Sequence, residues 1–129
     1  MFIGWALYVF YKTMTTQIKM EPLKDPSQLL DVERLVYHAQ RPGFRITELQ
    51  LSASQTVPWH FHTNVQDTFY VLQGCLRIFL QEPKEDVRLA PGETYAVPAR
   101  RPHLVTNAGE ESVVFLVLQA GEYDFIPLT

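Results

Sequence analysis

Three of the chain's four histidines lie in two short stretches whose spacing is suited to holding a metal ion. One residue separates His60 from His62, so on a β-strand both side chains point to one face while Phe61 points to the other. Asp67 follows five residues after His62, and His103 lies in a later predicted strand. Three imidazoles and one carboxylate form a donor set that first-row transition metals accept. We therefore predict one divalent ion as the cofactor, drawn from iron, manganese, nickel and zinc.

The residues around these histidines follow two regular patterns. Residues 54–74 read Ser54, five residues, His60-x-His62, four residues, Asp67, six residues and Gly74, and residues 92–107 read Gly92, five residues, Pro98-x-Arg100, two residues, His103, three residues and Asn107. These stretches resemble the two signature motifs of the cupin superfamily, G-x5-H-x-H-x(3,4)-E-x6-G and G-x5-P-x-G-x2-H-x3-N. The resemblance covers about residues 44–120. It implies that the three histidines bind a metal, and it implies an all-β fold, the cupin double-stranded β-helix, a barrel related to the jelly roll.

Three positions depart from these motifs. Ser54 stands where the first motif has glycine, and serine is also tolerated in turns. Arg100 stands where the second motif has glycine, so the loop lacks a glycine's freedom at positive φ. Asp67 stands where the first motif has glutamate, and its side chain is one methylene shorter. Its carboxylate either binds the ion directly or acts through a water. Gln66 also offers an amide oxygen, but its parity points to the opposite face.

Five side chains near the motifs are candidates for contacting a substrate. Arg100 and Arg101 come just before the last predicted histidine ligand, and the fork of donors on arginine suits carboxylates and phosphates. Their alternative role is that of solvated loop residues. Three aromatic residues, Trp59, Tyr70 and Tyr95, are candidates for the pocket wall, with packing in the barrel as the alternative.

The predicted site leaves two classes of function open. The protein fills at most four coordination positions, so an ion that prefers octahedral geometry keeps positions for water, dioxygen or a substrate. The first class is a metalloenzyme acting on a small oxygen-rich or anionic molecule, either an oxygenase or an isomerase or lyase working through a metal-bound enolate. The second is a non-catalytic, metal-dependent domain that binds or senses a small ligand. Because cupins carry many chemistries, the motifs do not choose between these classes.

Short apolar or alternating runs, separated by Gly, Pro and Asn, predict the strands that position these residues. We expect strands at 44–51, 59–62, 67–73, 75–80, 94–97, 103–106 and 113–118, while 29–37 is ambiguous between a short helical turn and a strand. We divide the chain into an N-terminal segment 1–43, a barrel 44–120 and a C-terminal tail 121–129.

Two of the runs, 69–72 and 113–118, are apolar at both parities. A strand with one face in water would alternate, so these runs predict that both faces are covered. A second subunit is one cover for the outer face and an N-terminal strand is another. We predict a homodimer.

Length, charge and cysteine content narrow the range of possible folds and partners further. The 129 residues are the size of one domain. A net charge of −3 and the lack of a basic run with interleaved aromatics argue against nucleic acid as a partner. Cys75 is the single cysteine, which excludes an internal disulfide. We expect a cytoplasmic protein that binds a small molecule.

The first eleven residues are apolar almost throughout. A membrane span needs about 20 residues, so we expect no stable membrane anchor. Three explanations stay open for this stretch. The start codon is assigned upstream of true initiation at Met14 or Met20, or the stretch adds a strand to the barrel, or it makes a weak membrane contact.

Overall fold

The computed structural model describes residues 30–128, and every regular element in this part of the chain is a β-strand. The strands are β1 (Arg34–Arg41), β2 (Phe44–Leu51), β3 (Thr56–Phe61), β4 (Gln66–Gln73), β5 (Leu76–Leu80), β6 (Glu85–Leu89), β7 (Thr94–Val97), β8 (His103–Asn107), β9 (Val113–Ala120) and β10 (Ile126–Pro127). The described residues include no helix that could span a membrane. The predictions for the apolar residues 1–11 lie outside the described part of the chain.

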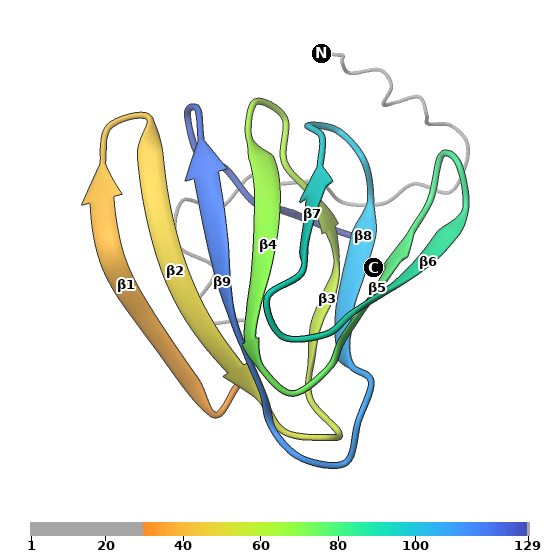
Figure 1. Ribbon diagram of the computed structural model, residues 1–129. Coiled ribbons are helices and arrows are strands. Elements are labelled where there is room, and N and C mark those ends of the chain that lie inside the picture. Colours follow the sequence, from red (N-terminus) through yellow and green to blue (C-terminus); the bar gives the residue numbers. More distant parts are fainter. Residues whose placement is uncertain (1–29, 129) are drawn as a thin grey trace.

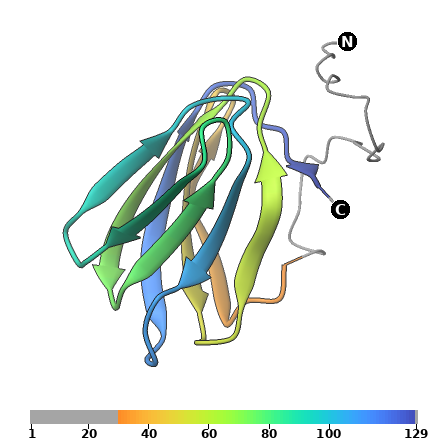
Figure 2. The same cartoon turned by 90° about the vertical axis from the view of Figure 1, so that its right-hand side faces the viewer.

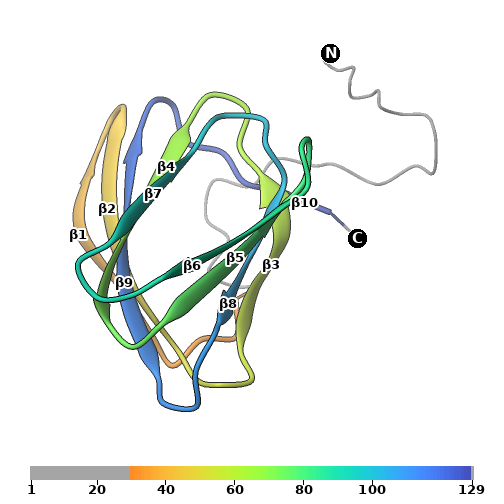
Figure 3. The same ribbon diagram turned by 45° about the vertical axis from the view of Figure 1, so that its right-hand side comes forward.

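The strands form two five-stranded antiparallel sheets that face each other (Figure 1). The first sheet has the order β1-β2-β9-β4-β7, and the second has the order β10-β3-β8-β5-β6. Figure 2 shows the second sheet in front of the first, and Figure 3 shows the interior enclosed between them. The chain changes sheet at every connection except those from β1 to β2 and from β5 to β6. The predicted all-β class and jelly-roll arrangement are therefore confirmed.

Alternation along the strands decides which side chains enter the interior. In β9 every second residue is buried, from Val113 to Gln119, and β2 shows the same period of two. The apolar core is formed by side chains from both sheets, chiefly Leu51, Val71, Leu76, Ile78, Val113 and Phe115, none of which is exposed to solvent. This packed core is the main source of stability, because burial of apolar surface is the dominant favourable term in folding.

The strand predictions hold for most of the barrel and differ at four places, one of which is the short strand β10 within the predicted tail 121–129. Residues 34–41 form a strand, which resolves the ambiguity of the 29–37 region in favour of β structure. β3 begins at Thr56 rather than at residue 59, and its pairing with β8 shifts register around the exposed Pro58, where the missing N–H group is tolerated. β6, with the sequence EDVRL, was not predicted, because charged residues dominate this edge strand.

The turn between β4 and β5 explains one motif glycine. Gly74 has a φ of +83°, which L side chains rarely adopt. A Cβ atom there would lie 2.7 Å from the carbonyl oxygen of Ser112 and 2.9 Å from the Cα of Val113. Only glycine fits this position without a shift of the neighbouring backbone.

The outer face of the first sheet carries apolar side chains. Tyr70 is 39% exposed and Leu72 is 44% exposed on β4. The neighbouring outward residues of β9, Leu116 and Leu118, are half-buried. The runs 69–72 and 113–118, which are apolar at both parities, therefore place one set of side chains in the core and the other set on an apolar outer face.

Candidate metal centre

The two histidines of the second sheet lie directly opposite each other. His60 on β3 and His103 on β8 are register partners in antiparallel strands, and both side chains point inward. Their ring centroids lie 4.3 Å apart. His60 and His103 are 3% and 1% exposed, so both imidazoles are removed from bulk water.

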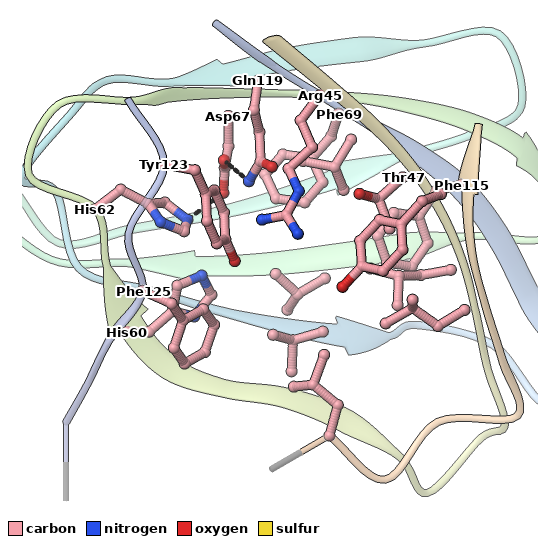
Figure 4. Close-up of a pocket in the computed structure, with 17 residues that line it drawn as sticks. Arg45, Thr47, His60, His62, Asp67, Phe69, Phe115, Gln119, Tyr123 and Phe125 are labelled. Carbon is pink, nitrogen blue, oxygen red and sulfur yellow. Dashed lines mark hydrogen bonds and ion pairs between the residues drawn. The ribbon is translucent and has the colours of Figure 1, made fainter. Parts of the chain in front are cut away.

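The first sheet contributes the carboxylate from the facing side. Asp67 on β4 is 2% exposed, and it is the register partner of Gln119 on β9. The amide of Gln119 donates to Asp67 Oδ1 at 2.7 Å, as Figure 4 shows. Asp67 Oδ2 lies 3.0 Å from the Nε2 atoms of both His62 and His103. One carboxylate oxygen is therefore held by the protein, while the other faces two imidazoles.

His62 follows the last residue of β3 and keeps the inward parity of His60. The loop before β8 holds it there, since Arg100 donates its backbone N–H to the His62 carbonyl at 2.6 Å. Arg100 has a φ of +70°. The position at which the cupin motif has glycine is therefore left-handed here as well, although it carries an arginine side chain. Because arginine lacks the freedom of glycine at positive φ, the backbone at Arg100 is strained.

All three imidazoles use Nδ1 to contact a backbone carbonyl. The partners are Pro58 for His60 at 2.8 Å, Asp124 for His62 at 2.5 Å and Arg101 for His103 at 2.8 Å. A carbonyl oxygen only accepts hydrogen bonds, so Nδ1 carries the hydrogen in each ring. In a neutral ring the lone pair is then on Nε2, which is the arrangement that prepares a histidine to bind a metal. Where the Nε2 atoms of His62 and His103 donate to Asp67 Oδ2, at 3.0 Å, an ion that binds there displaces the proton.

The charges of the cluster are strongly coupled. Burial alone would raise the pKa of Asp67, but the charge of His62 and the hydrogen bonds from His103 and His62 hold that pKa well below its usual value. Burial, together with the positive charges of His103 and His62, holds the pKa of His60 well below its usual value. Burial also opposes protonation of His62, but Asp67 outweighs it and raises the pKa of His62. The cluster therefore favours an ionised Asp67 with a neutral His60.

The four side chains fit a metal ion by chemistry and geometry. One candidate ligand atom from each of His60, His62, Asp67 and His103 lies within 4.8 Å of the others, and all four residues are buried. A buried carboxylate needs a positive partner, and three Nε2 lone pairs beside it accept a cation rather than a second anion. The structure brings together all four residues that the sequence suggested as ligands.

The five predicted substrate contacts do not line the cavity beside this cluster. Arg101 donates to the carbonyls of Gln81 and Pro83 and to the carboxylate of Glu85, which directs it toward the β5–β6 turn. Tyr95 donates its hydroxyl to the same Glu85 at 2.8 Å. Three others lie elsewhere: Arg100 and Tyr70 are exposed, and Trp59 is half-buried at the parity opposite to His60.

The cavity is instead lined by residues that sequence reasoning did not single out. Its volume is about 50 Å³, and its polar lining includes Arg45, Thr47, Gln119 and Tyr123 beside the cluster. Phe125 stacks on His60 with ring centroids 4.3 Å apart and planes 14° apart. The inward parity of Arg45 and Gln119, visible once the strands are known, is the one sequence signal that could have found them.

The C-terminal residues 121–128 complete the site. Asp124 accepts hydrogen bonds from the backbone N–H and the hydroxyl of Thr63, at 2.9 and 2.5 Å. This anchor places Tyr123 and Phe125 over the histidines, and β10 then pairs with β3 next to His60. Burial raises the pKa of Tyr123 well above its usual value, so its hydroxyl stays protonated at neutral pH.

Asn107, the last residue of the second motif, has a structural task. Its amide donates to the carbonyls of Leu51 and Glu111, at 3.2 and 2.8 Å, and its side-chain oxygen accepts from Gly109 at 2.8 Å. These bonds hold the β8–β9 turn, which agrees with the side-chain to backbone bonding expected at this position.

A protein-family model described as "Cupin domain" matches residues 47–119, more than half of the chain. The chain belongs to the cupin family. The match includes all four residues of the candidate ligand cluster, His60, His62, Asp67 and His103. Among curated proteins, none matches this cupin in sequence.

Solved structures share the fold of this cupin at low sequence identity. A cupin-2 domain containing protein from Shewanella frigidimarina NCIMB 400 is 18% identical, with a TM-score of 0.58 over 73% of this chain and 86% of its own. An uncharacterized conserved protein with a double-stranded β-helix domain from Klebsiella pneumoniae subsp. pneumoniae MGH 78578 is 14% identical, with a TM-score of 0.65 over 92% of this chain and 98% of its own.

An enzyme is also among the similar structures. Recombinant oxalate oxidase, in complex with glycolate, is 18% identical with a TM-score of 0.61. The alignment covers 67% of this cupin but only 46% of the oxidase, so the chain spans about half the length of that protein. These likenesses show the double-stranded β-helix fold.

Proposed function

We propose that this cupin is a metal-dependent enzyme of the oxygenase type, acting on a small oxygen-rich or anionic organic molecule. The observation that carries the proposal is the buried cluster of His60, His62, Asp67 and His103, which adjoins a cavity. The ion is iron or manganese in this proposal, and elemental analysis distinguishes these two metals from nickel and zinc.

The chain's own residues would hold and shield the ion. The three Nε2 atoms and the Asp67 carboxylate form the ligand set, while Gln119 and the backbone carbonyls orient it. Tyr123 and Phe125 cover the histidines and limit the entry of water. When bound, a redox-active ion supplies the electron transfer that no side chain of this site provides.

The cavity lining favours an oxygenase over an isomerase or lyase. Those two reactions remove a proton from carbon, so they need a positioned general base. Among the described residues, the cavity lining has no carboxylate or imidazole other than members of the cluster. Tyr123 is a poor base because burial raises its pKa. The likeness to the fold of an oxalate oxidase is consistent with redox chemistry on a small acid.

Oxygen uptake tests this proposal. The protein, purified without a histidine tag and loaded anaerobically with iron(II), is mixed with glycolate, lactate, malonate or oxalate in an oxygen electrode. We expect uptake with at least one acid, lost in His62→Ala. The control is His38→Ala, because His38 is 45% exposed by side chain and pairs with Glu48 away from the cluster. Turnover that proceeds without oxygen, or with zinc, would contradict the oxygenase class.

The second candidate is a metal-dependent domain that binds or senses a small ligand without turning it over. The same lack of an uncommitted acid or base in the described cavity lining favours it. This candidate predicts that small acids raise the melting temperature of the metal-loaded protein while no oxygen is consumed and no product forms.

We also propose a homodimer through the outer face of the first sheet. Tyr70 and Leu72 are exposed next to the half-buried Leu116 and Leu118. They support a contact between copies, because burial of an exposed apolar sheet face against a second subunit is favourable. Light scattering at micromolar concentration should give twice the mass of one chain, and Leu72→Glu should halve it. Gln73→Glu, an exposed polar neighbour, serves as the control, and a monomeric wild type would refute the dimer.

A further inference from the structure

Arg45 is a buried cation for which the described part of the chain supplies no counterion. It lies on β2 with its side chain facing inward, and it is 5% exposed. Its Nε atom is buried and has no hydrogen-bond partner among residues 30–128. The guanidinium is in contact with two aromatic rings, 3.8 Å from the centroid of Tyr123 and 4.8 Å from that of Tyr37. These contacts orient the group but do not neutralise it, and an unpaired buried charge is costly.

The position of Arg45 suggests what the missing partner is. It lines the same cavity as His60, His62 and Asp67, and Figure 4 shows its guanidinium next to Tyr123. It also lines an outer groove of about 560 Å³ formed by the β1–β2 turn and residues 121–123. Arg45, Gln119 and Tyr123 line both spaces, so they lie between the groove and the cluster, and we call this position the neck. A ligand that enters from the groove passes the guanidinium on its way to the metal centre.

The chemistry of the lining favours a singly charged planar anion. Arginine presents a flat fork of N–H donors that matches the two oxygens of a carboxylate. Arg45 is the one fixed cation among the described residues that line the cavity, and the remaining lining is largely apolar. A phosphate would carry more charge and would leave oxygens without donors. At about 50 Å³ the inner cavity has room for a few waters, each of which needs about 10–15 Å³, or for a ligand group of a few heavy atoms.

We propose that Arg45 binds the carboxylate of a small monocarboxylic acid at the neck of the cavity, with the rest of the molecule directed toward the metal cluster. This inference rests on the proposed function and names the substrate class of the same site. Arg45 selects the ligand by charge and by the planar shape of the carboxylate. Tyr123 and Tyr37 hold the guanidinium plane in place.

The test is a calorimetric titration of metal-loaded protein with acetate and glycolate, and with phosphate and sulfate for comparison. The variants are Arg45→Met, which removes the charge, and Arg45→Lys, which keeps the charge but loses the fork. Arg88→Met is the matched control, because Arg88 is exposed on β6. We expect the wild type and the control to bind acetate or glycolate more tightly than phosphate or sulfate. Arg45→Met should weaken binding at least tenfold, about 1.4 kcal/mol, with an intermediate loss in Arg45→Lys.

A second readout separates binding from folding. Without ligand, Arg45→Met should melt at the same or a higher temperature than the wild type, because an unpaired buried charge has been removed. If Arg45→Met does not fold, Arg45→Lys alone must still weaken carboxylate binding. Unchanged affinity in a folded Arg45 variant would overturn the proposal, as would a wild type that binds phosphate more tightly or no carboxylate at all.

Metal content is measured in every sample, so that failure of this inference and failure of the proposed function are distinguished. Metal retained with carboxylate binding lost in Arg45→Met supports both. A wild type without metal overturns the proposed function, and the titration then still tests Arg45, because the contact between guanidinium and carboxylate does not need the ion. Metal present with equal carboxylate affinity in the wild type and Arg45→Met overturns the role of Arg45 alone.

Discussion

The two ends of the barrel interior are built by the same strands but have opposite chemistry. At one end the inward side chains of β2, β4 and β9 are Leu51, Val71 and Val113, none of which is exposed. At the other end of the same strands the inward positions hold Arg45, Asp67 and Gln119. One end is packed with apolar side chains for stability, and the other buries charges whose desolvation is costly. Burial of these charges therefore lowers the stability of the fold at the polar end, where the proposed functional site lies.

The register of strand pairing brings the polar residues together at one end of the barrel. In the first sheet Arg45 pairs with Gln119, and Gln119 pairs with Asp67, so three polar residues form a row across the strands. In the facing sheet His60 pairs with His103. Residues that are far apart in the sequence meet because antiparallel pairing places them at the same height. A shift of one residue in either sheet would move these side chains to the outer face.

The largest expected effect on stability lies at the apolar end. Leu76 on β5 is fully buried, and Leu76→Ala leaves a cavity in the core. We expect the free energy of unfolding to fall by about 2–5 kcal/mol, measured by urea denaturation. Metal content per folded molecule should not change, because no ligand is disturbed. A loss of metal in folded Leu76→Ala would show that the two ends are not separable.

The next effect concerns the turn that joins the two sheets at the apolar end. Gly74→Ala places a Cβ 2.7 Å from the Ser112 carbonyl oxygen, at a φ of +83°. We expect a loss of about 1–3 kcal/mol in the free energy of unfolding. Gly92→Ala is the control, since its φ of +86° is similar but no atom of a described residue lies within 4 Å of the added Cβ. Equal losses in the two variants would mean that strain in φ dominates and that close approach does not matter.

At the polar end, protons should compete with metal. Asp67 raises the pKa of His62 against the opposing effect of burial, so without metal this ring takes up a proton at a higher pH than an ordinary histidine. Metal binding must displace that proton. Below the raised pKa we expect zinc affinity to fall about tenfold per pH unit, or about 1.4 kcal/mol. Titrations of chelator-treated protein between pH 8 and pH 5 check this, and an affinity that does not depend on pH would contradict it.

The same pKa shifts determine how the stability of the metal-free protein changes with pH. The raised pKa of His62 contributes stability that is present at low pH and is lost as the pH rises through that pKa. The lowered pKa of Asp67 contributes stability that is present above its ordinary pKa and is lost as the pH falls toward the lowered value. Thermal melts of Asp67→Asn against the wild type should therefore converge in strong acid. A stability difference that persists unchanged below pH 3 would contradict the role of Asp67.

The smallest effect is expected at the strained loop beside the cluster. Arg100 has a φ of +70°, and glycine adopts this conformation without steric cost. Arg100→Gly should raise the free energy of unfolding by up to about 1 kcal/mol, because the strain relieved is partly offset by the entropy of glycine. Metal content should stay constant. A marked loss of metal would show that the Arg100 side chain supports the cluster despite its exposure.

The sequence predicted the ligand cluster better than its surroundings, for a physical reason. His60 and His62 share one face by strand parity, and Asp67 and His103 follow from the spacing of the two cupin-like motifs, so all four could be found without coordinates. Arg100 and Arg101 were chosen because they precede His103 in the chain, but neighbouring residues on a strand or turn point in different directions. Arg101 turns toward the β5–β6 turn, where it bonds Gln81 and Glu85.

The residues that were missed depend on long-range placement. Arg45 lies 15 positions before His60 and meets the site only through the pairing of β2 with β9 and of β9 with β4. Tyr123 and Phe125 belong to the predicted tail, and they reach the site because Asp124 is anchored by Thr63. Strand parity indicates that Arg45 faces inward, but it does not say which residues of other strands Arg45 meets.

Elemental analysis of the tag-free protein by plasma mass spectrometry, with Asp67→Ala beside the wild type, tests the central claim that the polar end of the barrel is a metal centre. We predict close to one iron, manganese, nickel or zinc per wild-type chain and a large loss of that metal in Asp67→Ala. A wild type that carries no metal and takes up none of these ions when they are added would contradict it.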